Sequence, residues 1–449
     1  MEWLHKLKNQ KWDEILFYIG LALLPFDNLF FAPSRGWATI APIVFFVYVL
    51  WNEKYVLNGS VLPKKQQLLV LLILVLSVFG YIFHQPTIST TLDAAQTLIL
   101  GFSFYFAVQI YFIQKKGDGA KALRLLFTVY TIAFFYGVLY CMKIPFVERV
   151  MEIIEKRHYG RLQYTFTEPS FISMHLFGVL LPCATIFKEH KKESRALLML
   201  IGFYLLLSFV FGGSTRLYLD ALVVAVIVIG CRFFRGKFTK KKAVILAAAG
   251  AAFVVAVIGL SFVERIRNIM KMGVYGDASL ASRFFRINAL FKGFIANPVG
   301  FLFGYGLGNT FYPFHLGYHA ALLEYRNAYA TEVLSLKGVV TTSFFCGHFR
   351  VIADFGLIVY LLFLWYLLKG VKNKLPFFLI MTYLYVQFDS FAFYTVWLYL
   401  FYMRYESAKD TRCALKKAAS RFDPAPPAVK IKNRFLEEIL LFVREAAKE

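Results

Sequence analysis

A short polar stretch, RLQYTFTEPS from Arg161 to Ser170, stands directly before a long apolar run and carries side chains that can do chemistry. Its arginine can bind phosphate oxygens, because the planar guanidinium group donates two parallel hydrogen bonds. Its glutamate, Glu168, lies at a predicted membrane border, where a carboxylate needs a partner. We therefore interpret Glu168 either as a catalytic residue that orients an acceptor or takes its proton, or as a structural partner of Arg161.

Three further arginines, Arg216, Arg283 and Arg350, join Arg161 as candidate ligands of a pyrophosphate group. When the bond between a sugar and a diphosphate breaks, negative charge develops on the diphosphate, and positioned guanidinium groups stabilise that charge. The alternative for each arginine is a side chain that snorkels or forms a salt bridge at the membrane border. For Arg216 the alternative is favoured, because Asp220 follows one helical turn later.

One histidine, His348, is the candidate general base, since an imidazole can take the proton of a hydroxyl acceptor near neutral pH. Its alternative is a structural histidine. The polar loops contain no DxD sequence or tight carboxylate cluster, so we expect neither a metal nor another cofactor. The glycine-rich run from Gly304 to Asn309 follows no clear strand, so it predicts either a turn that brings backbone close to a ligand or an ordinary loop.

The composition fixes the class of protein that must position these residues. The chain has 449 residues, of which 59% are hydrophobic and 17% charged, whereas soluble domains are nearer half apolar and a quarter charged. Recurring apolar runs of about 17 to 22 residues are long enough to cross a bilayer core. We therefore predict an all-α polytopic membrane protein. The net charge of +23 fits basic loops on the cytoplasmic side, so no nucleic-acid partner is expected.

About twelve transmembrane helices are predicted from these runs. The last two are short and turn at Asp389 and Ser390. The predicted spans cover residues 15–31, 37–51, 68–83, 94–113, 122–141, 171–187, 196–211, 217–234, 243–262 and 352–368, with the final pair within 375–403.

The distribution of lysine predicts the orientation. The N-terminus and the loops after the second, fourth, sixth, eighth and tenth spans are rich in lysine, which places them in the cytoplasm. Residues 1–262 then hold the first nine spans and an outer loop, 142–170. Residues 263–351 form a large, partly helical outer loop, and 352–403 hold the last spans. The basic tail, 404–449, has apolar residues at helical spacing that predict an amphipathic helix, either on the inner membrane surface or packed on another protein surface.

Three segments resemble elements of the bacterial O-antigen polymerase and O-antigen ligase superfamily. RLQYTFTEPSF resembles the family's arginine and EPS element, and CGHFRVIADFGLIVYLL resembles its histidine element. SRFFRINALFKGFIANPVGFLFGYGLGNTF has the order of an arginine, a helix, an Asn-Pro pair and a glycine-rich run. The ligases especially often carry asparagine after the histidine, whereas Phe349 follows His348 here. This departure favours the polymerase.

The resemblance implies a glycosyltransferase of the GT-C-like fold, multi-pass in the bacterial inner membrane, with its active site facing outward. Its donor would be a glycan on undecaprenyl pyrophosphate and its acceptor a second lipid-linked repeat unit of O-antigen, capsule or exopolysaccharide. Membrane lipids and a chain-length regulator are the implied partners. The alternatives are a ligase that transfers glycan to a lipid acceptor, and a transporter or flippase of the same lipid-linked glycan. A transporter would place charged residues and broken helices near mid-membrane, whereas the predicted charges gather in the outer loops.

Overall fold

The structure, a computed structural model, describes residues 2–29, 40–62, 64–155, 161–211, 214–234, 264–325, 346–369 and 374–421, together with isolated positions between them. Within these residues the chain is helical, and its isolated β-bridge pairs Leu29 with Glu155. The predicted ninth span, 243–262, falls almost entirely outside the described residues, and so does the predicted amphipathic helix of the tail. The expected all-α class is therefore confirmed for the described part of the chain.

The first half of the bundle runs from α1 to α9 and includes two π-helical and one 3-10 segment. Their bounds are α1 Glu2–Ala22, α2 Ile40–Trp51, α3 Glu53–Leu57, α4 Lys64–His84, α5 Ile88–Gln109, η1 Ile110–Gln114, α6 Gly119–Cys141, α7 Pro145–Ile154, η2 Pro169–Phe171, α8 Ile172–His175, η3 Leu176–Leu180 and α9 Leu181–Ile186.

The second half contains the remaining spans and the helices of the predicted large loop. Their bounds are α10 Lys191–Val210, α11 Thr215–Phe234, α13 Glu264–Met272, η4 Gly273–Gly276, α14 Ala278–Ala296, α15 Pro298–Phe303, α16 Phe311–Glu324, α18 Gly347–Leu368, α19 Leu375–Tyr385 and α20 Tyr394–Arg421. The helices α19 and α20 flank a turn at 386–393, which confirms the predicted hairpin at Asp389 and Ser390.

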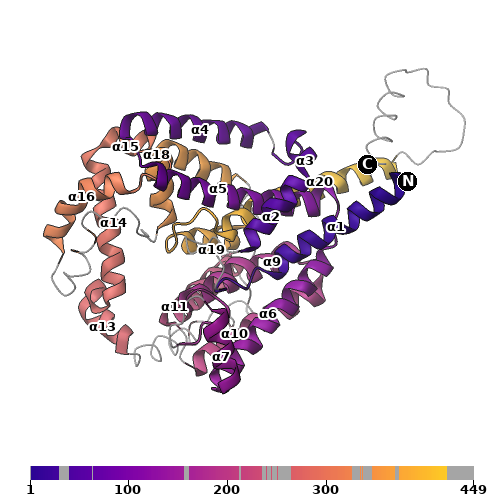
Figure 1. The fold of residues 1–449 in the computed structure, drawn as a ribbon, viewed down its shortest axis with the longest axis horizontal. Coiled ribbons are helices and arrows are strands. Elements are labelled where there is room, and N and C mark those ends of the chain that lie inside the picture. The colour runs from indigo at the N-terminus through magenta and orange to yellow at the C-terminus, as the bar shows by residue number, and fades with distance from the viewer. Residues whose placement is uncertain are drawn as a thin grey trace, which may run out of the picture.

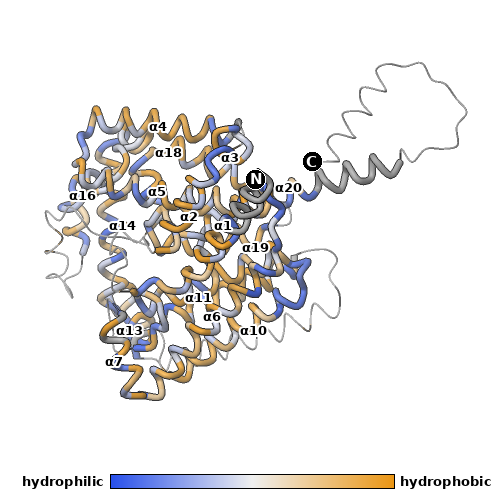
Figure 2. The backbone as a smooth tube through the Cα atoms, turned by 45° about the vertical axis from the view of Figure 1, so that its right-hand side comes forward, coloured by the Kyte–Doolittle hydropathy of each residue, from blue (hydrophilic) through white to orange (hydrophobic). Residues whose placement is uncertain are grey.

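Six described helical segments are long and apolar enough to cross a membrane, and α2 and α19 are shorter apolar helices. Figure 2 shows apolar residues along α4, α6 and α10 and hydrophilic residues gathered near the helix ends. The chain is thus a helical membrane protein, whereas the expected count of twelve spans stays a prediction. The six segments are Gln66–His84, Ile88–Gln114, Gly119–Cys141, Pro169–Ile186, Lys191–Val210 and Gly347–Leu368.

Three helices begin or end away from the predicted span boundaries, which themselves stay predictions. The helix α1 ends at Ala22 instead of continuing to residue 31, because Pro25 cannot continue the hydrogen-bond ladder and the next backbone N–H groups donate to the carbonyl of Thr165 instead. The helix α18 begins at Gly347, five residues before the predicted span. The helix α20 continues through the predicted boundary at 403 to Arg421, since Ala, Lys and Glu are strong helix formers.

The loops predicted to be cytoplasmic meet at one end of the bundle. There Lys115 pairs with Asp13 at 2.6 Å, and Lys409 pairs with Glu189 at 2.6 Å. Figure 1 shows α1 beginning and α20 ending at this same end, with α14 and α16 at the opposite end. The predicted separation of inner and outer loops is therefore present in the fold, whereas which end faces the cytoplasm stays a prediction.

The end of the bundle that holds α14 and α16 has a hydrophobic core of its own. Aromatic and aliphatic side chains of α14, α15 and α16 pack with the start of α18, and this cluster includes Phe285, Leu290, Phe314, Tyr318 and Ile352. The large predicted loop is therefore a helical unit fixed to the membrane bundle through α18.

The helix α18 is broken at Gly356, whose φ of 88° and ψ of 161° are not helical. In a straight helix His348 and Tyr360 would lie about 18 Å apart along the axis, yet the Tyr360 hydroxyl lies 3.0 Å from Nδ1 of His348. The chain must therefore bend sharply at Gly356. A side chain at this position would meet the backbone of Leu302, Phe303 and Gly304, so only glycine fits.

Candidate functional site

Two of the four predicted arginine ligands, Arg216 and Arg350, meet at the turn formed by residues 386–393. The Cζ atom of Arg216 lies 4.3 Å from the ring centroid of Phe388, and the Cζ atom of Arg350 lies 4.7 Å from that of Phe391. Each arginine sits in the first turn of its helix, α11 or α18. The positive ends of the two helix dipoles therefore add to the two guanidinium charges, which makes this turn suited to an anion.

Arg216 lies beside Asp220 on α11, with 3.6 Å between Nε and Oδ2. The carboxylate accepts hydrogen bonds from the Tyr383 hydroxyl at 2.6 Å and from Gln387 at 2.8 Å. The Nε and Nη2 atoms of Arg216 are buried and make no hydrogen bond within the described part of the chain. The ion pair predicted from the sequence is present, and it leaves two donors of the guanidinium group unused by the described residues.

Arg350 lies beside Asp354 on α18, also at 3.6 Å. Its Nη1 donates to the backbone carbonyl of Asp389 at 2.6 Å. Asp354 is fully buried, and its carboxylate accepts hydrogen bonds from the Thr310 hydroxyl at 3.2 Å and from the backbone of Gly308. Arg350 and Asp354 therefore tie the start of α18 to the 386–393 turn and to the glycine-rich run.

Arg283 and Glu168 belong to the same cluster. Arg216 lies within electrostatic range of both, although they come from α14 and from the residue that precedes η2. Glu168 is half-buried and accepts a hydrogen bond from the Ser170 hydroxyl at 3.1 Å. The structure thus places Arg216 and Arg350 at the 386–393 turn, with Glu168 and Arg283 within electrostatic range of Arg216.

Arg161 lies apart from the described contacts of this cluster and is exposed. The residues that follow it are anchored in the bundle, because Leu162, Tyr164 and Phe166 are buried. The Tyr164 hydroxyl donates to the carbonyl of Tyr204 at 3.2 Å. The RLQYTFTEPS stretch is therefore a packed segment that presents Glu168, instead of an open loop.

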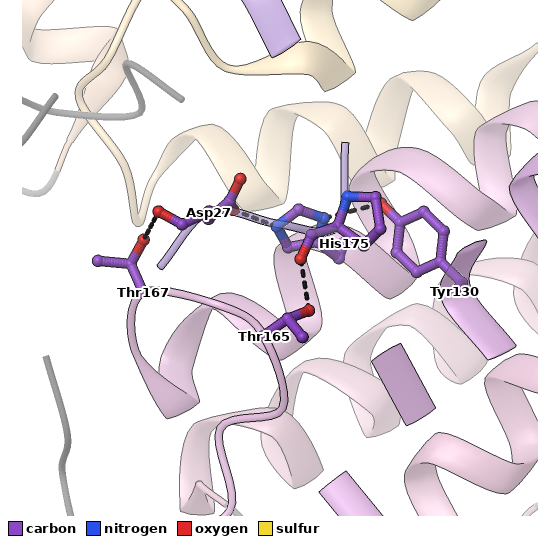
Figure 3. Close-up of polar contacts among 6 residues, drawn as sticks. Asp27, Tyr130, Thr165, Thr167 and His175 are labelled. Atoms are coloured by element: carbon purple, nitrogen blue, oxygen red, sulfur yellow. Dashed lines mark hydrogen bonds and ion pairs between the residues drawn. The ribbon is translucent and has the colours of Figure 1, made fainter. Parts of the chain in front are cut away.

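A buried polar chain that the sequence reasoning missed lies beneath this stretch. Nε2 of His175 lies 2.5 Å from Oδ2 of Asp27, and Nδ1 of His175 lies 2.8 Å from the Tyr130 hydroxyl. Figure 3 shows His175 between Asp27 and Tyr130, with Thr165 and Thr167 beside Asp27. The sequence contained a signal for this chain, because Asp27 and His175 fall inside apolar runs predicted as spans. An ionisable side chain in a span usually has a partner or a function.

His348 is surrounded by protein partners. Its Nε2 donates to the carbonyl of Thr382 at 3.0 Å, so its Nδ1 is left to accept the hydrogen bond from the Tyr360 hydroxyl. Both ring nitrogens are therefore occupied in this structure. The histidine fixes α19 to both halves of the broken α18, and it would have to release Tyr360 before it could take a proton.

The glycine-rich run is buried between helices. Gly304 packs on the backbone of Asp354 to Gly356, while Gly306 packs on the backbone of Gly80 in α4. The backbone N–H of Tyr305 donates to the carbonyl of Ala353 at 2.7 Å. The backbone of this run therefore approaches other backbone and supports the break in α18, whereas its predicted approach to a ligand stays a prediction.

An apolar groove begins beside Arg350 and runs along α18. It encloses about 770 Å³, including the open solvent at its mouth, between α4, α5, α18 and α20. Val351 and Phe391 line the end near Arg350, while Gln66 and Tyr366 line the far end. Figure 1 shows α4 and α18 side by side along this edge of the bundle. The groove therefore connects the arginine cluster with the other end of the bundle.

Within the described residues, no group of three or more His, Cys, Asp or Glu side chains could hold a metal ion. Two arginines contact the 386–393 turn, Arg216 and Arg350, and each lies beside an aspartate, Asp220 or Asp354. The guanidinium N–H groups that these aspartates leave over suit an anionic ligand. No family model, no curated protein and no solved structure matches this chain.

Proposed function

We propose that this protein is a glycosyltransferase that polymerises undecaprenyl-pyrophosphate-linked oligosaccharide repeat units. The proposal places it in the bacterial inner membrane, with the arginine cluster at the outer face. The observation that carries it is the combination of that cluster with the apolar groove. A pyrophosphate at the 386–393 turn would meet Arg216, with Arg283 within electrostatic range and Arg350 holding the turn. A polyprenyl chain attached to the pyrophosphate would have the groove beside Phe391 to lie in.

In the proposed reaction, a hydroxyl of the acceptor repeat unit attacks the anomeric carbon of the donor sugar. The bond between that carbon and the pyrophosphate oxygen breaks, and its electron pair leaves with the pyrophosphate. Arg216 and Arg283 stabilise the charge of this leaving group. The proton of the acceptor hydroxyl passes to a carboxylate, and we assign this role to Glu168, which is half-buried and within electrostatic range of Arg216.

The preference for a polymerase over a ligase still comes from the resemblance, because His348 is followed by Phe349. A ligase would use the same donor and differ in its acceptor. The arginine cluster and the groove support the donor class and leave the acceptor to be tested.

A transporter of the same lipid-linked anion is the second candidate, and one observation favours it. The sequence predicted that charges gather in outer loops, away from broken helices. The helix α18 differs from that prediction, because it is broken at Gly356 beside the buried Asp354. Discontinuous helices with buried charge are typical of transporters.

The test is an assay in liposomes that contain the purified protein and a fluorescent undecaprenyl-pyrophosphate repeat unit. Polymerisation produces a ladder of glycan lengths on a gel, and the Arg216→Ala variant is the matched negative control. Transfer to an added lipid acceptor without a ladder would support a ligase. Movement of the lipid between leaflets without any new glycosidic bond would support the transporter and contradict the proposed chemistry.

A further inference from the structure

The helix α7 carries an exposed apolar face just beyond the end of the span α6. On α6, Ile132, Phe135 and Leu139 are 55%, 57% and 38% exposed. Beyond the end of α6, Met142 and Phe146 are 64% and 75% exposed. An exposed face of a membrane span contacts lipid, so the exposed apolar residues of α7 lie next to a lipid-facing surface.

The two sides of α7 differ in what covers them. Val147 is buried against the protein, at 8% exposure, whereas Phe146 and Ile153 are 75% and 73% exposed. Arg149 is exposed and lies between Phe146 and Ile153 on the same helical face. An arginine in this position can lay its aliphatic stem along apolar surface and keep its charge at the phosphates of lipid head groups.

The place of α7 in the chain fits a membrane surface. Three residues separate the end of α6 at Cys141 from the start of α7 at Pro145, and among them Lys143 has the left-handed conformation, with a φ of 51°. The chain therefore turns directly at the end of a span. Short helices with one apolar face and basic residues are typical of membrane interfaces.

We propose that α7 lies on the membrane surface, with Met142, Phe146 and Ile153 among the acyl chains and Arg149 at the head groups of acidic phospholipids. This inference does not depend on the proposed glycosyltransferase activity.

The lipid contact has a structural consequence for the neighbouring stretch. Glu155 follows α7 and accepts hydrogen bonds from the Tyr136 hydroxyl at 3.0 Å and from Gln163 at 3.3 Å. It also pairs with the backbone of Leu29. Lipid bound to α7 therefore holds the segment that leads from Gln163 to Glu168 at a fixed height relative to the membrane surface.

The experiment uses the full chain in nanodiscs of phosphatidylglycerol, with the photoreactive p-benzoylphenylalanine at one position. Phe146→p-benzoylphenylalanine and Ile153→p-benzoylphenylalanine should each gain the mass of one lipid after irradiation. The matched control is the same substitution at Glu148, an exposed residue on a different side of α7, which should give several-fold less adduct. Equal lipid adducts at 146 and 148, no lipid adduct at 146, or a cross-link to a second protein chain would each overturn the proposal.

A second measurement tests the head group. In nanodiscs with equal amounts of phosphatidylglycerol and phosphatidylcholine, the adduct at 146 should contain more phosphatidylglycerol. Adding Arg149→Gln should bring the ratio of the two adducts to about one, because the cationic attraction to acidic lipid is lost, whereas Glu148→Gln should leave the preference intact. Equal labelling of both lipids in the chain that retains Arg149 would contradict the assigned role of this arginine.

Discussion

The helices α11 and α18 begin with the same local pattern, RLYLD and RVIAD, yet the two arginines have different surroundings. Arg350 donates to the Asp389 carbonyl, and its partner Asp354 is held by Thr310. Arg216 keeps two buried nitrogen atoms without a hydrogen bond in the described part of the chain. An unused guanidinium donor that is buried costs free energy unless a ligand or water meets it.

The difference extends to the predicted catalytic residues. Glu168 lies near Arg216, while His348 lies two residues before Arg350 and uses both ring nitrogens for protein contacts. We therefore assign binding and chemistry to the Arg216 side, and attachment of the broken helix to the Arg350 side. The same Arg-x-x-x-Asp pattern serves binding on one side and attachment on the other because the residues around each arginine differ. Four pairs of substitutions can test this assignment.

The largest difference is expected between Glu168→Gln and His348→Gln. Loss of a general base slows transfer roughly 100-fold to 10,000-fold, so Glu168→Gln should nearly abolish the glycan ladder. His348→Gln should retain most of the transfer rate and instead lose about 1–3 kcal/mol of stability, because Tyr360 and Thr382 lose a partner. The measurements are initial rates in liposomes and thermal unfolding in detergent. The reverse result, an inactive His348→Gln with normal stability, would restore the histidine as the base.

The second prediction concerns the Arg350 side of the turn and the stability of the fold. Arg350→Ala leaves the buried Asp354 without its countercharge and should cost about 3–5 kcal/mol. Adding Asp354→Asn removes the uncompensated charge, so the double variant should regain part of the loss. Thermal unfolding of the purified variants measures both effects. An unchanged unfolding temperature for Arg350→Ala would show that this pair does not hold α18.

The third prediction concerns the Arg216 side of the turn and the rate of glycan transfer. Arg216→Ala should lower the transfer rate roughly 100-fold to 1,000-fold, as loss of one positioned donor does. The substitution also leaves the buried Asp220 without its countercharge, although Asp220 keeps its hydrogen bonds from Tyr383 and Gln387. The rate is therefore compared at a temperature where thermal unfolding shows the variant to be folded. Arg216→Lys should recover little, because an ammonium group cannot form the bidentate contact. Normal glycan lengths from Arg216→Ala would remove this arginine from the site.

The smallest effects are expected at the aromatic rings of Phe388 and Phe391, which contact Arg216 and Arg350. A cation–π contact contributes about 0.5–2 kcal/mol, depending on desolvation. Phe388→Leu should therefore weaken donor binding up to about tenfold, because it alters the surface that holds Arg216. Phe391→Leu should mainly lower the unfolding temperature, although it also lines the groove. If both substitutions change binding equally, the two sides of the turn are equivalent.

Much of the local architecture was predictable from the sequence. Apolar runs of sufficient length predicted the membrane helices, because hydrocarbon thickness sets how many apolar residues a helix needs. The hairpin at Asp389 and Ser390 followed from the polar break in an apolar run. The Arg216–Asp220 pair was predicted because residues four apart on a helix are neighbours in any fold.

Other features were decided by the tertiary structure alone. The pair of Asp27 and His175 joins residues 148 positions apart, and only the contact of α8 with the segment that follows α1 reveals it. Gly356 is one glycine in an apolar run, and its sharp bend depends on contact with the backbone of Leu302 to Gly304. Likewise, the different roles of Arg216 and Arg350 come from the turn at 386–393. A sequence specifies which side chains a helix carries, whereas their hydrogen-bond partners come from distant segments that only packing brings within reach.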